Sequence, residues 1–411
     1  MARTAGNRSV SSWTALSALA LGAVAMQPSG CAEDEGAISK QSEEAQDILT
    51  QLLIDTWPEV VQPALTDARS TAQAMTDATG AWADAIESGS GAKAARTNAQ
   101  EAWAAAMTSW ERVELMQLGP AGPSLSAIGG QDLRDEIYSW PTTNACRVDQ
   151  ETGEEAWDDA DFFEANLVNV YGFDALETLL FTEASENSCP PQVPPNSDGA
   201  FDALGEDGVS LNRARYATAL GEQILVNIDQ IYDGWDPEGG DFAGTLADAG
   251  GQGNLFVSQE AGLNAIFDAL FYLELRTKDR KLAWPLGLKD CGLDDCTGMI
   301  ETPVAGNSHT WIGENLAGFY ALYSGNGGKG IGDLLVSVGQ TGIHLDISES
   351  LEGAETAANQ LGMPLDQALE EDPEGLQALH DNVKEVTDVL KNDLATLLML
   401  QIPSEAAGDN D

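Results

Sequence analysis

The segment 170–181 restricts the fold of this chain most, because it places two acidic residues inside an apolar helix. In the predicted helix over 158–183, apolar side chains occupy almost every direction around the axis, and such a helix is buried. Asp174 and Glu177 lie in its middle, one helical turn apart, so they share a face. A buried carboxylate without a partner is costly. We therefore expect either a pair held by an arginine or by backbone donors, or a ligand-binding or catalytic site.

The charge of the chain is strongly acidic. Its 411 residues include 19 Lys and Arg against 67 Asp and Glu, which gives a formal net charge of −48. Such a charge repels nucleic acids and anionic lipid surfaces, so we expect no nucleic-acid partner. Most of the acidic residues are expected to form a solvated exterior without a specific partner.

The first thirty residues have the pattern of an export signal. Two arginines precede an apolar stretch over 13–26, which is too short for a confident membrane span. Ser29 and Gly30 then precede Cys31 in a run that resembles a lipobox. We expect a lipoprotein signal peptide over 1–30 and lipidation of Cys31, with a plain secretory signal as the alternative. The protein would then belong to the bacterial cell envelope and contact the membrane through its lipid anchor only.

The cysteine count is consistent with export. Besides Cys31, the chain has four cysteines, and an even number in an exported chain favours disulfides. Three pairings are possible. Cys291 and Cys296 are close in sequence and are expected to bridge each other, and Cys146 and Cys189 would then pair on either side of the predicted central helix.

The chain is predicted to be all-α, because apolar residues recur at helical spacing and no strand-like alternation dominates. Pro58 and Pro63 are expected to break or kink the first helix. The predicted helices cover 43–79, 92–118, 158–183, 211–232, 258–282, 308–323, 331–351 and 373–400. The predicted organisation comprises an acidic tether over 31–42, an N-terminal half over 43–185, a Pro- and Gly-rich linker over 186–210, a C-terminal half over 211–403 and an acidic tail over 404–411.

A family resemblance rests on the run Gly172-Phe-Asp-Ala-Leu-Glu177. This run is similar to the Gly-x-His-x-x-Glu signature of the imelysin family, with Asp174 in place of the histidine. The segment 132–141 resembles a family segment that also leads to a Trp-Pro, and 301–308 resembles one in which a Glu and a Ser lead into a helix.

The resemblance covers roughly 43–403. It implies two helical-bundle halves packed side by side. The imelysin family includes imelysin-like peptidases, iron-regulated protein A and domains of iron-uptake lipoproteins.

Several further residues are candidate contributors to a site around the acid pair. Arg134 is the nearest obvious cation, and Ser308 is also predicted to cap the helix that follows it. Each of these residues has a surface or structural role as the alternative, and a lone histidine is more often structural than a ligand. The candidates are Glu111, Glu114, Arg134, Glu301, Ser308 and His309.

The resemblance implies two classes of function, and the substitution at Asp174 discriminates between them. Zinc hydrolases usually hold their metal with imidazole nitrogens, whereas two carboxylates form an all-oxygen pair that suits iron or another hard cation. We therefore expect an exported, non-proteolytic lipoprotein that binds a metal ion or a metal complex, with iron acquisition as one role. The alternatives are an imelysin-type metallopeptidase and a surface interaction protein that has lost the metal site.

Overall fold

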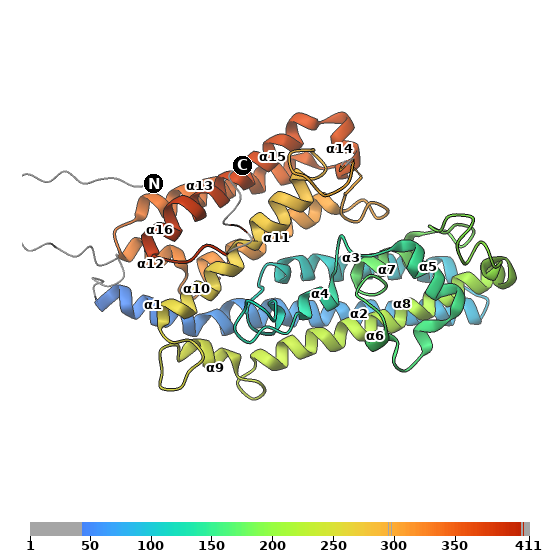
Figure 1. The fold of residues 1–411 in the computed structure, drawn as a ribbon, viewed down its shortest axis with the longest axis horizontal. Coiled ribbons are helices and arrows are strands. Elements are labelled where there is room, and N and C mark those ends of the chain that lie inside the picture. Colours follow the sequence, from blue (N-terminus) through green and yellow to red (C-terminus); the bar gives the residue numbers. More distant parts are fainter. Residues whose placement is uncertain (1–42, 295, 297, 404–405, 407–411) are drawn as a thin grey trace, which may run out of the picture. The chain divides into compact units, whose positions relative to one another are not determined.

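The computed structural model describes residues 43–294, 296, 298–403 and 406, and within them every regular element is helical (Figure 1). This confirms the predicted all-α class. The predicted signal peptide over 1–30, the tether over 31–42 with Cys31 at its start, and all of the predicted tail except Ala406 lie outside the described residues.

The N-terminal helices follow the predicted periodicity closely. The two prolines do not end the first helix, because the chain passes through a π-helical stretch, Thr56–Val61, that contains Pro58 and places Pro63 at the start of the next helix. Such widened turns absorb a missing backbone donor without ending a helix. The elements are α1 (Glu43–Asp55), α2 (Gln62–Glu87) and α3 (Ala92–Glu114).

The predicted central helix over 158–183 is wrong in its extent. Residues 166–172 are not helical, and the apolar Leu167 within them is 75% exposed. Gly172 has a φ of 93° at the start of the next helix, and a Cβ there would lie 2.8 Å from the carbonyl oxygen of Ile137. A side chain is therefore excluded at this position. The elements are α4 (Leu133–Ile137), α5 (Ala145–Glu154), α6 (Phe162–Ala165) and α7 (Phe173–Phe181).

The second part of the chain begins with the long helix α8 (Ala200–Trp235), which is kinked at Gly205 with a φ of 66° and whose first residues lie within the predicted linker 186–210. The helix predicted over 331–351 is two helices, separated near Gly339, which has a φ of 80°. The remaining elements are α9 (Phe242–Ala247), α10 (Gln259–Leu270), a π-helical stretch Leu273–Ala283, α11 (Ser308–Ser324), α12 (Ile331–Ser337), α13 (Thr341–Leu361), α14 (Leu365–Glu371), α15 (Pro373–Val389), a π-helical stretch Leu390–Leu394 and α16 (Ala395–Leu398).

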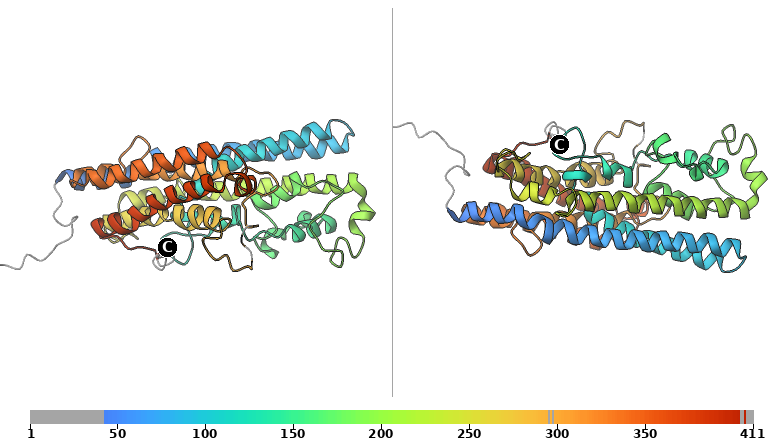
Figure 2. Two further views of the ribbon diagram at one scale, coloured as in Figure 1. Left: turned by 90° about the horizontal axis from the view of Figure 1, so that it is seen from above. Right: turned by 90° about the horizontal axis from the view of Figure 1, so that it is seen from below.

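The helix α3 packs against helices from distant parts of the sequence. On one side it packs with α2, which in turn packs along α8, and on another side it contacts α11 (Figure 2). Trp103 of α3 and Trp311 of α11 are buried with ring centroids 6.1 Å apart. Aromatic pairs of this kind contribute large buried areas, so one continuous core joins helices from both ends of the sequence.

Both predicted disulfides are present. Cys146 at the start of α5 pairs with Cys189 with a Cα–Cα distance of 4.6 Å, and Cys291 pairs with Cys296 with a Cα–Cα distance of 5.9 Å.

Across the described residues, no helix combines the length and the apolar character that crossing a membrane requires.

Candidate functional site

The acid pair lies on the short helix α7, which buried contacts hold in place at its N-terminal end. The indole N–H of Trp103 donates to the carbonyl oxygen of Phe173 at 2.9 Å, and the Tyr216 hydroxyl donates to the carbonyl oxygen of Val170. Asp174 is in the first turn of this helix rather than in the middle of a long one. Asp174 and Glu177 are only 5% and 6% exposed, as the apolar surroundings predicted.

Asp174 is bonded through one of its two carboxylate oxygens. Its Oδ2 accepts a hydrogen bond from the Thr143 hydroxyl and lies 3.4 Å from the Ser139 hydroxyl. Its Oδ1 is buried and makes no hydrogen bond of ordinary geometry, although the backbone N–H groups of Asp174 and Ser139 also act on the carboxylate and lower its pKa. Burial raises the pKa of Asp174 to about 6, although the Thr143 hydrogen bond opposes the shift. A buried acceptor without a partner is costly, so this oxygen is a natural contact point for a cation.

Glu177 connects α7 to the segment that precedes α11. Its Oε1 accepts the backbone N–H groups of Val304 at 2.9 Å and Ala305 at 2.8 Å. Burial raises the pKa of Glu177 to about 7 against these two donors, and the nearby carboxylates of Asp174 and Glu301 raise it further. Backbone donors therefore orient one oxygen of Glu177, but they do not neutralise its charge.

Neither carboxylate of the pair makes an ion pair with any described residue, and Arg134 points elsewhere. The Arg134 guanidinium pairs with Glu114 and, at 2.7 Å, with Asp135, and the residue is 2% exposed. Of the structural alternative, the described residues do not form a pair held by an arginine, but backbone donors do hold Glu177.

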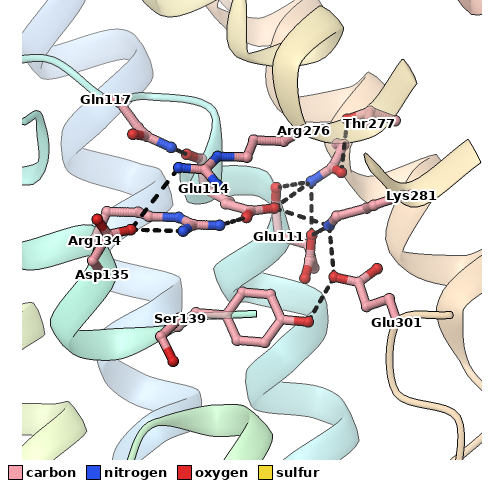
Figure 3. A network of polar contacts seen from close by, with 12 residues as sticks. Glu111, Glu114, Gln117, Arg134, Asp135, Ser139, Arg276, Thr277, Lys281 and Glu301 are labelled. Carbon is pink, nitrogen blue, oxygen red and sulfur yellow. Dashed lines mark hydrogen bonds and ion pairs between the residues drawn. The ribbon is translucent and has the colours of Figure 1, made fainter. Parts of the chain in front are cut away.

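Three other candidate acids belong to a second assembly, the buried charged cluster (Figure 3), which consists of Glu111, Glu114, Glu301, Lys281 and Arg134. The Lys281 ammonium lies 2.5 Å from Glu111, 2.9 Å from Glu114 and 2.9 Å from Glu301. Each of these five side chains is at most 3% exposed. Buried charges persist when cations and anions meet at such distances.

The pKa shifts within the buried charged cluster follow the position of its cations. Burial would raise the pKa of Glu114, but Lys281 and Arg134 outweigh burial and hold this pKa well below its usual value. Burial raises the pKa of Glu111 well above its usual value, and Lys281 only partly opposes the shift. The two cations beside Glu114 therefore favour its ionised form more strongly than Lys281 alone favours that of Glu111.

Two consecutive residues link the buried charged cluster to the acid pair. The Tyr138 hydroxyl donates to Glu301 Oε1 at 2.6 Å, and the hydroxyl oxygen of the next residue, Ser139, lies 3.4 Å from Asp174 Oδ2 while it donates to the Val168 carbonyl oxygen at 2.8 Å. The acid pair and the cluster are thus parts of one buried polar region between α3, α7, the stretch Leu273–Ala283 and the segment before α11.

The predicted helix cap at Ser308 is wrong. Asn307 takes the cap position, and Ser308 is the first residue of α11, with a buried hydroxyl that has no hydrogen-bond partner. His309 follows, and its Nδ1 is also buried without a partner, while burial lowers its pKa. The segment 304–305, whose backbone bonds Glu177, lies between Glu301 and these two residues. Three of the sequence candidates, Glu301, Ser308 and His309, are therefore close together along the chain.

Sequence reasoning missed several residues that build this region. Lys281 had a signal, because it falls in a basic stretch of a chain that contains only 19 Lys and Arg. The hydroxyl donors to the acid pair and the amide of Asn315, which donates to Glu111 at 2.7 Å, had no distinctive sequence signal. The missed residues are Tyr138, Ser139, Thr143, Lys281 and Asn315.

The donor set favours some metals over others. In the described part of the chain, no group of three or more His, Cys, Asp or Glu side chains converges in a way that could hold a metal ion. Asp174 and Glu177 therefore do not fit a zinc site, which usually has at least three protein ligands with nitrogen or sulfur among them. Carboxylate and hydroxyl oxygens are donors that hard cations prefer, but Asp174 and Glu177 are buried, and the main cavities among the described residues are lined by other side chains.

Comparisons with known proteins give a consistent picture. Residues 61–392 match the family model of Imelysin, a peptidase family. The chain is similar in structure to a putative iron-regulated protein A precursor from Parabacteroides distasonis, with a TM-score of 0.64, 17% identity, and coverage of 85% of this chain and 94% of that chain. It is also similar to an imelysin-like protein from Psychrobacter arcticum, with a TM-score of 0.62, 18% identity, and coverage of 88% of this chain and 98% of that chain. No curated protein matches the chain. At these identities the two structures establish the fold alone.

Proposed function

The chain belongs to the imelysin family, and from this premise we propose that it is an exported, non-proteolytic member that binds a metal ion or a metal complex at Asp174 and Glu177. One observation carries the proposal. A buried oxygen of Asp174 makes no hydrogen bond of ordinary geometry, and the second carboxylate one helical turn away has no cationic partner among the described residues. A bound cation would offset the burial of both charges.

Iron is the first cation to test. One structural neighbour is described as a putative iron-regulated protein A precursor, and oxygen donors suit hard cations such as ferric iron. Because only two acidic side chains gather here, a metal complex that carries its own remaining ligands fits better than a bare ion. In this proposal Asp174 Oδ1 and the Glu177 carboxylate bind the cation, while Thr143 and the backbone of 304–305 keep the two groups oriented.

The absence of proteolysis is proposed from the residue at position 174. The family motif has a histidine there, and an aspartate replaces a nitrogen ligand by oxygen. Export is proposed from the signal-like first thirty residues and from the two disulfides, which persist in oxidising compartments. The protein would thus act in the cell envelope, anchored through Cys31.

Isothermal titration calorimetry of the purified protein tests the binding site. We expect heat with ferric citrate that disappears in the double variant Asp174→Asn, Glu177→Gln. Asp268→Asn is a matched control, because burial raises the pKa of Asp268 to about 6 as well, but this residue lies on α10 and has no second acid one turn away. Calcium and zinc serve as comparison cations. Binding that persists in the double variant, or that Asp268→Asn abolishes instead, would refute the proposed site.

Incubation with an unfolded protein substrate tests the metallopeptidase alternative. We expect no cleavage that a chelator inhibits. Chelator-sensitive cleavage that the double variant loses would replace our proposal by the peptidase function, and an absence of binding with all three cations would favour a surface interaction protein that has lost its metal site.

A further inference from the structure

A second polar site lies away from the acid pair, where the loop after α3, the helix α10 and the segment 399–403 meet. Two cavities of about 450 and 560 Å³ adjoin there. They have in common the lining residues Gln117, Ser126, Ala127, Asn264, Asp268 and Gln401, so they form one space, which we name the Asp268 pocket. Its volume is in the range of small-molecule sites.

The lining of the Asp268 pocket is apolar with a few polar groups, which is the usual composition of a small-molecule site. Ile128 and Met399, which are 38% and 65% exposed, contribute apolar surface. The two charged residues that line it, Asp268 and Glu260, are both acidic, and Glu260 is exposed. An anionic ligand is therefore disfavoured, whereas a cationic one would meet a complementary charge.

Asp268 is held in place but not neutralised. Its Oδ2 accepts the Asn264 side-chain amide at 3.0 Å, while its Oδ1 is buried and has no hydrogen-bond partner. Asn264 is itself oriented, because its Oδ1 accepts the backbone N–H of Gln401 at 2.7 Å. No described residue forms an ion pair with Asp268, and burial raises its pKa to about 6, so most of the group is ionised at neutral pH.

We propose that the Asp268 pocket binds a small organic amine, with the ammonium group bonded to Asp268 and the apolar part of the ligand packed against Ile128 and Met399. A metal ion is a poorer occupant, because the pocket offers one buried carboxylate, whereas hard cations take several charged oxygen ligands. An ammonium group needs a single carboxylate and neutral acceptors around it. This inference does not depend on the function proposed for Asp174 and Glu177.

Calorimetry with three probes of one shape tests this inference at pH 7.5: phenethylamine, the neutral 2-phenylethanol and the anionic 3-phenylpropanoate. We expect phenethylamine to bind and the other two to bind about tenfold more weakly or less, because only the amine forms a charge-assisted hydrogen bond. Asp268→Asn keeps the shape of the side chain and removes its charge, so it should weaken phenethylamine binding by a similar factor. Thermal unfolding of the variant verifies that it is folded.

Two further variants keep the test decisive. Ser126→Trp places a bulky side chain at an exposed position of the lining, and it should block phenethylamine while leaving Asp268 unchanged. The double variant Asp174→Asn, Glu177→Gln should bind phenethylamine as the wild type does, which separates this site from the proposed metal site. Equal binding of the amine and the alcohol, unchanged binding in both Asp268→Asn and Ser126→Trp, or no binding to the wild type would overturn the inference.

Discussion

Two acid pairs with the same spacing lie in the interior of this protein, and they differ in what neutralises them. Glu111 and Glu114 on α3, like Asp174 and Glu177 on α7, are three residues apart and buried. The first pair meets Lys281, whereas the second meets only hydroxyl and backbone N–H donors. Burial acts on both pairs, so it cannot by itself explain their different states.

The pKa shifts express this difference. The pKa of Glu114 lies well below its usual value because Lys281 and Arg134 outweigh burial, while burial raises the pKa values of Asp174 and Glu177 to about 6 and about 7. Lys281 and Arg134 thus set Glu114 apart from the second pair, although burial still raises the pKa of Glu111.

Removal of the buried cation should destabilise the protein most. Lys281→Met leaves three buried carboxylates without their shared ammonium, and breaking a buried ion pair costs about 3–5 kcal/mol. Chemical denaturation at pH 7 measures the change in the free energy of unfolding. Lys93→Met at an exposed position is the control and should have almost no effect. A loss at Lys281 as small as that of the control would mean that this cation does not neutralise the cluster.

Replacement of Asp174 and Glu177 by uncharged side chains should instead increase the free energy of unfolding. Because the folded pKa values of Asp174 and Glu177 are raised, the native state binds more protons than the unfolded state between about pH 4 and pH 7. The stability that these groups contribute is fully present below their unfolded pKa values and is lost as the pH rises through the folded ones. Without metal, the double variant Asp174→Asn, Glu177→Gln should therefore be more stable than the wild type at pH 8, by about 2–4 kcal/mol.

Urea denaturation in the presence of a chelator measures this difference across the pH range. The advantage of the double variant should shrink as the pH falls and disappear near pH 4. A double variant that is less stable than the wild type at pH 8 would indicate that both charges are already satisfied within the protein.

Loss of the hydrogen bond between Tyr138 and Glu301 should have the smallest effect on the free energy of unfolding. Tyr138→Phe removes the 2.6 Å hydrogen bond to the buried Glu301 carboxylate, and a hydrogen bond to a charged group contributes about 1.5–3 kcal/mol. Chemical denaturation should show a loss at the lower end of this range, because Lys281 still contacts Glu301. Tyr320→Phe is the matched control, since Tyr320 is 50% exposed. Equal losses in the two variants would argue against the Tyr138–Glu301 link.

Some features of the fold could be predicted from the sequence because they depend on the spacing of residues that are close along the chain. Helical periodicity predicted the all-α class, and the even number of cysteines with two of them close together predicted both disulfides. The apolar neighbours of Asp174 and Glu177 predicted their burial correctly. The role of this pair in metal binding stays a prediction.

Other features were not readable because they depend on tertiary contacts. The helix predicted over 158–183 is interrupted before Phe173. The positive φ of Gly172 and its close approach to the Ile137 carbonyl are consequences of packing. Lys281 meets Glu111 across 170 positions of sequence, and no local pattern indicates such a distant partner. The donors to Glu177 are backbone N–H groups, which have no residue signature at all.

Calorimetry with ferric citrate at pH 6.5, in two buffers with different enthalpies of ionisation, tests whether Asp174 and Glu177 together bind a cation. At this pH most of Glu177 is protonated and most of Asp174 is ionised, so a cation that binds both should displace about one proton. We expect the wild type to release this proton and the variant Asp174→Asn, Glu177→Gln to show neither binding nor release. Binding without a change between the buffers, or the same binding in the variant, would contradict the claim that this acid pair receives the cation.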